Sequence, residues 1–486
     1  MSCGRAPVRL GQYSDAAMMD AIEVPAWPVF RRGLLAEGPG SIESYVGQTS
    51  ELPEFSNAPS KAAVIRELRN RLVPDDEHLW KAGPEAKLRA MNNFDKGYLA
   101  TEEVARYTYS LVSAYVECME ARHITNPRYR RYFYSFQQAV QGRGPIPSRE
   151  SLETLTGVNF VITGRSQLGR TAYIQRLRTM FGAPFRVVAP TLDDIKLVWY
   201  FPIIVLQWPT CGTLKGLLDQ FRDKLVSEIK DPQSLASVFK RMRGKSAATA
   251  AIAASVLLNV GLFVIDGACA QSLKGGVREI LMFLCKLQGH ANIPLLFSCS
   301  DVFMQGAKQL GPEVDAVLRG RCLAFEPLNA PPLDVAAVLR GHMLRDAPNQ
   351  VLAKLGLWYQ FNLWFWRAGL LSPLHEMPQD LPKWTHAHCH GRLGWLAAGF
   401  RSLHELLAWE PTLLKDGGPS ESTVTKAFGI ALSNCDAART AIRQYGKDPA
   451  SVSRSIVYQH LDHLPFVAGS MLEGFLPRPR LGVGHA

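Results

Sequence analysis

Residues 164–171 read GRSQLGRT and lie between a short apolar segment and a segment of helical periodicity. The apolar segment contains Val158, Phe160, Val161 and Ile162 and predicts a buried strand. Two glycines placed between a strand and a helix are typical of a phosphate-binding loop, whose main-chain N–H groups surround the phosphates of a nucleotide. An ordinary strand-turn-helix would fit this segment equally well. If the loop binds phosphate, the chain must form an α/β fold around a parallel sheet.

The expected phosphate loop departs from the usual pattern at one position. Arg170 stands where such loops carry a lysine. Arginine keeps the positive charge, but its planar guanidinium is bulkier and directs its donors differently from an ammonium. We predict that Thr171 holds Mg²⁺ and that the whole segment contacts the nucleotide. Its residues are Gly164, Arg165, Ser166, Gln167, Leu168, Gly169, Arg170 and Thr171.

Two further apolar segments end in polar side chains. Residues 261–266 end at Asp266 and predict a Walker B strand, whose carboxylate holds the Mg²⁺ shell. The next residue in such strands is usually a glutamate that activates the attacking water, and here it is Gly267. Residues 293–300 end at Ser300, where a sensor hydroxyl would face the γ-phosphate. Three such strands predict an open parallel sheet that binds its ligand at the carboxyl edge.

In this order, the segments resemble the TnsC/TniB family, which are AAA+ regulators of heteromeric transposons, including CRISPR-associated ones. The resemblance covers residues 60–445 and departs from the family at Arg170 and Gly267, both in the hydrolysis machinery. Beyond the Walker motifs, it is carried by residues 65–69, 74–76, 126–127, 204–215, 318–325 and 357–364.

The resemblance implies an AAA+ P-loop core, a parallel sheet flanked by helices, with an N-terminal helical extension and a C-terminal helical lid. Patterns of Gly, Pro and periodicity place the boundaries of these parts. We expect an N-terminal arm at 1–60, a helical region at 61–150, the nucleotide-binding core at 151–330, the lid at 331–445 and a C-terminal segment and tail at 446–486.

Family members form ATP-bound rings or spirals around duplex DNA, and this implies roles for further residues. Either Arg319 or Arg321 would reach the γ-phosphate of the neighbouring subunit, and Arg392, at the start of a lid helix, would sense the nucleotide of its own subunit. Thr213 and Lys215 become candidates for contacts with DNA phosphates. Such contacts would not depend on base sequence, because phosphates carry no base information.

Charge also favours a polyanionic partner. The chain has 54 basic and 43 acidic residues and a net charge of +11. Residues 126–134 interleave aromatic residues with Arg128, Arg130 and Arg131, which could neutralise DNA phosphates. A helix with its basic side chains in solvent and its tyrosines in the core fits this segment equally well. The basic residues at 240–245 are a weaker candidate.

The sequence predicts a cytoplasmic protein. Its nine cysteines are scattered without a CxxC pair, as in reduced proteins, and no secretory signal is evident. Residues 247–265 are nearly uncharged and long enough to span a bilayer. We favour instead an alanine-rich helix over 246–258 that turns at Asn259 into the Walker B strand, because Asp266 ends the segment.

The function implied by the resemblance is regulation of transposition. The protein would bind ATP and Mg²⁺, form a homo-oligomer on double-stranded DNA without sequence specificity, and link a transposase to a target-selection protein (TniQ/TnsD-like or a CRISPR effector). Hydrolysis would be weak or absent, because Gly267 cannot position water. One alternative is an active DNA-dependent ATPase that uses Asp301 or a neighbouring subunit's acid. Others are a nucleotide-free adaptor on a decayed P-loop fold and, with less support, a helicase-loader relative.

Overall fold

A computed structural model describes residues 47–465 of the protein, apart from short gaps and the segments 73–78, 148–157, 189–196, 230–245, 312–316 and 340–350. The chain divides into two compact units, which are described separately. The core unit comprises Ala26–Leu68, Ala100–Glu326 and Ala441–Ala486, and the lid unit comprises Met1–Pro25, Arg69–Leu99 and Pro327–Thr440. The expected helical region at 61–150 is thus divided between the two units.

The core unit is built on one sheet, which has seven strands in the described part of the chain. These are β1 (Gly47–Thr49), β2 (Asn159–Gly164), β3 (Phe185–Val188), β4 (Leu197–Gln207), β5 (Val260–Ala268), β6 (Leu295–Cys299) and β7 (Arg321–Phe325). Their order across the sheet is β1-β3-β4-β5-β6-β2-β7. Neighbouring strands are parallel, except that β3 and β4 are antiparallel.

The strand order confirms the expected α/β fold class, a mostly parallel sheet flanked by helices. β2 leads into the phosphate loop, and β6, which leads to Ser300, separates β2 from the Walker B strand β5. Because these strands are parallel, their carboxyl ends lie at one edge of the sheet. At this edge Gly164 pairs with Phe325, and Asp266 pairs with Gln207. We call this the carboxyl edge and the opposite one the amino edge.

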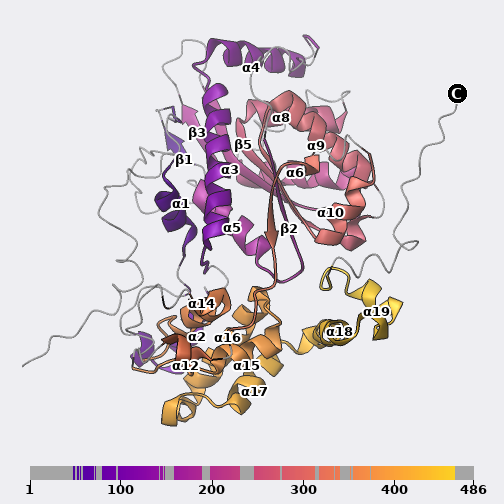
Figure 1. Ribbon diagram of the computed structural model, residues 1–486. Helices are drawn as coiled ribbons and strands as arrows, with labels where there is room; N and C mark the ends of the chain where they lie inside the picture. Colours follow the sequence, from indigo (N-terminus) through magenta and orange to yellow (C-terminus); the bar gives the residue numbers. More distant parts are fainter. Residues whose placement is uncertain are drawn as a thin grey trace, which may run out of the picture. The chain divides into compact units, whose positions relative to one another are not determined.

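Helices cover both sides of the sheet (Figure 1). α1 (Lys61–Leu68), α3 (Glu102–Ala121) and α5 (Arg170–Phe181) lie on one side, and α6 (Leu214–Glu228), α8 (Ala247–Leu257) and α9 (Val277–Ala291) lie on the other. The remaining helices of the core unit in the described residues are α4 (Pro127–Val140), η6 (Ala270–Leu273), α10 (Asp301–Lys308), the end of α18 (Asp436–Lys447), η9 (Pro449–Ser451) and α19 (Arg454–Gln459).

Residues 247–265 form a buried helix and strand. The side chain of Ser246 caps α8 by accepting from the N–H of Thr249, and Asn259 takes a left-handed φ of 44° before β5 begins. This confirms the sequence interpretation of the segment. Of the helices in the described ranges, none is long and apolar enough to cross a membrane. The eight described cysteines are free thiols.

A buried arginine joins α3 to the amino edge of the sheet. Arg122 follows α3 and is 2% exposed. Its Nη2 donates to the carbonyl of Val260 at 2.6 Å, and its Nη1 donates to that of Ala291 at 3.4 Å. These carbonyls lie at the start of β5 and the end of α9. α3 also contacts β2, because the Tyr107 hydroxyl donates to the carbonyl of Val161 at 2.9 Å.

The lid unit is helical and packs around aromatic rings. In its described residues it contains η3 (Leu79–Lys81), α2 (Pro84–Met91), α12 (Val335–Leu339), α14 (Gly356–Trp366), α15 (Leu381–Cys389), α16 (Leu393–Trp409), η7 (Pro411–Gly417), α17 (Glu421–Ala431), η8 (Ser433–Cys435) and the start of α18 (Asp436–Lys447). Phe365 and Phe400 stack with ring centroids 5.2 Å apart. Beside them His404 is buried, and its Nε2 lies 3.0 Å from the carbonyl oxygen of Phe365. Burial lowers the pKa of His404 to about 4.

Candidate functional site

The phosphate loop connects β2 to α5. Glycine is required at its two glycine positions for different structural reasons. Gly164 has φ 144°, and a Cβ there would lie 2.3 Å from the carbonyl oxygen of Phe325 in β7. Gly169 has φ 98° and is the N-cap residue of α5. Gln167, at φ 66°, is also in the left-handed region. The loop therefore turns sharply at the carboxyl edge before α5 begins.

The loop presents donors suited to an anion. Within the described residues, the amides of Gln167, Leu168 and Gly169 have no main-chain acceptor. The Nη1 atom of Arg170 is buried and has no hydrogen-bond partner there either. A buried guanidinium nitrogen without an acceptor is costly, and a phosphate oxygen would satisfy it. The loop therefore fits a nucleotide phosphate although arginine replaces lysine.

Arg170 lies near the carboxyl end of β6. Burial raises the pKa of the Cys299 thiol to about 12, and the positive charge of Arg170 acts against this rise. The guanidinium thus lies close enough to the carboxyl end of β6 to affect a thiol there. This position puts its charge at the sheet edge to which the expected sensor residue belongs.

A hydroxyl and a carboxylate form the expected magnesium pair. Thr171, in the first turn of α5, donates from Oγ1 to Oδ2 of Asp266 at 3.0 Å. Asp266 is 2% exposed and lies in β5 directly before the exposed Gly267. Oxygen ligands of these two kinds are those that Mg²⁺ takes in P-loop sites. The two residues fit the metal, which would neutralise charge on the β- and γ-phosphates when bound.

The residue after Asp266 differs from the usual arrangement in its main chain as well as its side chain. Gly267 has φ 85°, and the pairing of β5 with β6 is irregular between Ile265 and Ala268. A Cβ at Gly267 would lie 3.1 Å from Oε1 of Gln207. An L-residue in this conformation is strained. Position 267 therefore lacks both the water-activating carboxylate and a backbone that would easily carry one.

The sensor segment places two polar side chains at the carboxyl edge. Ser300 is 1% exposed, and its Oγ accepts from the N–H of Phe303 at 3.2 Å, which caps α10. Its hydroxyl proton remains available to an acceptor. The neighbouring Asp301 accepts a 2.6 Å hydrogen bond from Thr163, the residue before the phosphate loop. Sequence reasoning did not predict this Thr163–Asp301 contact, because no motif relates the two residues.

Arg319 and Arg321 lie at the amino edge, away from the phosphate loop. Arg321 begins β7 and pairs with Phe160, whereas the loop end of β2 pairs with Phe325. Four residues of strand separate these ends by about 13 Å. Both arginines are exposed. This position does not favour contact with phosphates of the same subunit, and the action of either arginine on a neighbouring subunit stays a prediction.

The two sets of expected DNA contacts lie at opposite edges of the sheet. Thr213 caps α6, and it and Lys215 are exposed beyond the carboxyl end of β4. Residues Arg128, Arg130 and Arg131 belong to α4, where Arg128 and Arg131 are exposed and Arg130 is partly buried. α4 lies at the amino edge, because the Tyr129 hydroxyl donates to Oδ1 of Asn259 at 2.8 Å. The two sets do not form one patch.

The aromatic rings of α4 pack on the fold, not on an external ligand. Tyr129 is fully buried, and Tyr132 is buried with its hydroxyl on the carbonyl of His290. This agrees with the alternative of a helix whose tyrosines face the core. The basic segment at 240–245 lies outside the described residues.

Arg392 is buried within the lid unit. It is 1% exposed, precedes α16, and its guanidinium lies 4.9 Å from the ring centroid of Trp395. Its Nη1 donates to the carbonyl of His390 at 3.2 Å. Its expected contact with a nucleotide stays a prediction.

Sequence reasoning missed one residue at the phosphate loop, Asp462. Its main-chain carbonyl accepts a 2.7 Å hydrogen bond from the N–H of Ser166. Its carboxylate accepts from the N–H of Ala270, with distances of 3.0 and 3.3 Å to its two oxygens. Ala270 follows the Walker B strand. No motif surrounds Asp462, so only the three-dimensional structure reveals its position.

No family model matches the chain, and no curated protein matches it. Among solved structures, it is similar to the Aeropyrum pernix ORC1 protein in complex with DNA, at 15% identity and a TM-score of 0.32 over 74% of this chain and 78% of that chain. It is also similar to the structure of Drosophila ORC bound to AT-rich DNA and Cdc6, at 14% identity and a TM-score of 0.25 over 77% of this chain and 54% of that chain. These scores are low, so the interpretation of the site rests on its own geometry.

Proposed function

We propose that the protein binds ATP with Mg²⁺ at the phosphate loop. The observation that carries this proposal is the 3.0 Å hydrogen bond between Thr171 and Asp266. It joins the expected Mg²⁺ ligands of the Walker A and Walker B segments at the carboxyl edge of a P-loop sheet. The buried Nη1 of Arg170 adds a donor that a phosphate would satisfy.

We propose that nucleotide acts mainly as a structural ligand and that hydrolysis is slow. Catalysis of phosphoryl transfer to water needs a residue that orients the water. Gly267 supplies no such side chain, and its φ of 85° disfavours any other residue. The bound nucleotide would then stabilise an interface between subunits, with Arg319 or Arg321 of one subunit near the γ-phosphate of the next.

We propose further that nucleotide-bound subunits assemble on duplex DNA without reading its sequence. Support comes from the net charge of +11 and from the exposure of Thr213 and Lys215 at the carboxyl edge. The biological role that we propose is regulation of transposition, in which the assembly links a target-selection protein to a transposase. Its support is the sequence resemblance to TnsC/TniB regulators.

Binding of a fluorescent ATP analogue, measured with and without Mg²⁺ and duplex DNA and alongside phosphate release, tests the proposal. We expect saturable Mg²⁺-dependent binding with little release. Arg170→Ala should weaken binding about tenfold, the scale of a charge-assisted hydrogen bond. Arg178→Ala is the matched control, because Arg178 lies on the same helix but pairs with Glu228 at 3.2 Å. Absence of binding at any concentration would contradict the proposal and favour the alternative of a nucleotide-free adaptor on a decayed P-loop fold.

A second candidate is an active DNA-dependent ATPase in which Asp301 replaces the missing glutamate. The Thr163–Asp301 hydrogen bond favours it, because it fixes a carboxylate next to Ser300. In that case DNA would stimulate phosphate release, and Asp301→Asn would abolish the stimulation while leaving nucleotide binding intact. Phosphate release that DNA does not change would exclude this candidate.

A further inference from the structure

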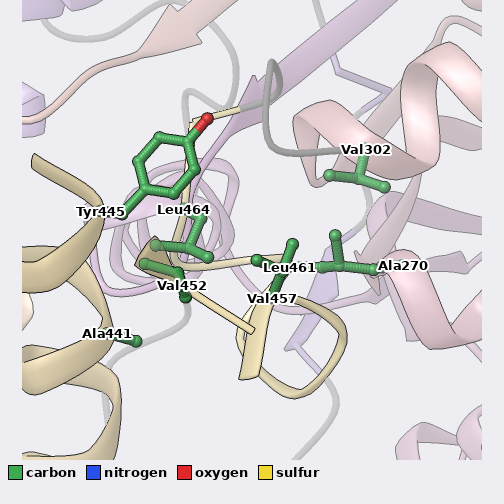
Figure 2. Close-up of a cluster of buried hydrophobic side chains, with 8 residues drawn as sticks. All are labelled: Ala270, Val302, Ala441, Tyr445, Val452, Val457, Leu461 and Leu464. Atoms are coloured by element: carbon green, nitrogen blue, oxygen red, sulfur yellow. The ribbon is translucent and has the colours of Figure 1, made fainter. Parts of the chain in front are cut away.

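The C-terminal segment of the core unit packs against the nucleotide edge. Eight buried side chains form a cluster, which we call the C-terminal cluster (Figure 2). Six of them come from residues after 440, and two come from the core near the expected site. The members are Ala270, Val302, Ala441, Tyr445, Val452, Val457, Leu461 and Leu464.

The two core members attach the cluster to the segments that follow β5 and β6. Ala270 begins the short helix after the Walker B strand, and Val302 lies two residues after Ser300. Figure 2 shows Leu461 and Val457 beside Ala270. Both leucines of the turn after α19, Leu461 and Leu464, are at most 4% exposed. Apolar burial thus holds this turn on the core.

Asp462 lies between these leucines and hydrogen bonds to the phosphate loop and to the segment after β5. Its main-chain carbonyl accepts a hydrogen bond from the N–H of Ser166, inside the phosphate loop, at 2.7 Å. Its carboxylate accepts a hydrogen bond from the N–H of Ala270 at 3.0 Å. One residue of the C-terminal segment therefore connects the phosphate loop to the segment after β5.

This contact opposes the binding of a triphosphate for two physical reasons. An amide of the loop that already donates to a carbonyl cannot donate to a phosphate oxygen. The carbonyl oxygen of Asp462 also carries partial negative charge at the loop, where the negative charge of a nucleotide would arrive, and its carboxylate adds charge at Ala270. The docked turn thus competes with a nucleotide for one donor of the loop, the N–H of Ser166.

We propose that residues 452–464 form an autoinhibitory segment that lowers nucleotide affinity, with Asp462 as its contact to the phosphate loop. This inference rests on the proposed nucleotide-binding function. Nucleotide binds to molecules in which the segment has left the loop, so the apparent dissociation constant rises as that fraction falls. Conversely, nucleotide releases the segment from the core.

Two variants and a matched control test the segment in the full-length protein, with fluorescent ATP analogue and Mg²⁺ as the ligand. Asp462→Ala removes the carboxylate bond to Ala270 but keeps the main-chain carbonyl, so it should loosen the docked turn and raise the apparent affinity roughly three- to tenfold. Leu461→Ala should act in the same direction by weakening the packing on Ala270. Asp448→Ala is the control, because Asp448 makes a similar bond to the N–H of Ala450 at 3.0 Å without touching the loop. It should leave affinity unchanged.

Hydrogen exchange tests the segment in the wild-type protein, without any substitution. In the wild type, nucleotide should speed amide exchange over residues 454–464. Asp462→Ala should speed it without nucleotide. Slower exchange in this segment on adding nucleotide would mean that the segment cooperates with the ligand, and it would overturn the proposal.

The affinities separate the failure of this inference from that of the proposed function. Equal affinity in the wild type and both test variants overturns the autoinhibitory segment but leaves nucleotide binding intact. Weaker binding by Asp462→Ala makes Asp462 part of the nucleotide site and also overturns it. An equal gain in nucleotide affinity in Asp448→Ala would mean that any substitution that loosens the C-terminal segment has this effect, and it would count against the proposal. If neither the wild type nor Asp462→Ala binds nucleotide, the proposed function fails and the inference with it.

Discussion

The hydroxyl of Thr171 lies 3.0 Å from Oδ2 of Asp266, so the first turn of α5 and the end of β5 meet through one hydrogen bond. These residues are 95 positions apart in the sequence. At the end of the phosphate loop, the hydroxyl oxygen of Thr171 and the carboxylate of Asp266 would hold a divalent cation, and the threonine would keep its proton. The pair is therefore ready to accept Mg²⁺ without a large rearrangement.

Replacing the hydroxyl should remove the metal-dependent part of nucleotide binding. We expect Thr171→Ala to bind the ATP analogue about tenfold more weakly in Mg²⁺ and as the wild type does in EDTA, because only the metal ligand is lost. Thr179→Ala is the control, since Thr179 lies on the same helix and bonds only to the carbonyl of Gln175 at 3.1 Å. Titrations with and without Mg²⁺ measure the effect. Equal affinity of Thr171→Ala and Thr179→Ala in Mg²⁺ would count against the metal pair.

Substitutions at Gly267 should lower the stability of the folded state and should not increase ATP turnover. At φ 85°, an alanine raises the energy of the folded state by about 1–2 kcal/mol, so Gly267→Ala should lower the melting temperature by a few degrees. Gly267→Asn should lower it less, because asparagine tolerates this conformation. We expect Gly267→Glu to share the loss and to gain no turnover. DNA-stimulated phosphate release by Gly267→Glu would show that the acid alone was missing.

The lid unit should lose stability as the pH falls from about 6.5 to about 4. The folded state holds His404 neutral down to about pH 4, whereas the unfolded chain protonates this residue near pH 6.5. Between these values the unfolded state binds more protons, so stability falls with falling pH. The loss from this group is about 2 kcal/mol between pH 7 and pH 5. Denaturant titrations of the wild type and His404→Phe measure it, and identical pH slopes would contradict the assignment.

If Lys215 contacts a DNA phosphate, its removal should change the salt dependence of DNA binding. Lys215→Ala should bind all duplex sequences more weakly and reduce the slope of log K against log salt by about 1. Lys224→Ala is the control on the same helix, because Lys224 already pairs with Glu228 at 2.6 Å. Fluorescence anisotropy at several salt concentrations measures both. Unchanged slopes in Lys215→Ala would remove this residue from the interface.

The sequence was sufficient to predict the strands that carry the Walker and sensor residues. Each is a short apolar segment that ends in a polar residue, and this local pattern predicts a buried strand without knowledge of the tertiary contacts. The turn at Asn259 was predictable for the same reason, since Asp266 fixed where the strand must end.

Other features depend on tertiary contacts that no local pattern encodes. Glycine adopts many conformations, so its presence at position 267 did not reveal a φ of 85°. The bond between Asp462 and Ser166 joins residues nearly 300 positions apart in a stretch without a motif. The alternation of arginine and tyrosine in α4 fitted two structures, and only the burial of Tyr129 and Tyr132 distinguished them.

The position of Arg122 limits how the protein can be shortened. The sequence suggested that the nucleotide-binding core begins near residue 150. Yet Arg122 supplies the donors for the carbonyls of Val260 and Ala291, and Tyr107 bonds to Val161. A fragment starting at 150 would remove these donors and expose the side of the sheet that α3 covers. The smallest portion that folds on its own should therefore begin before α3, at or upstream of its cap Thr101.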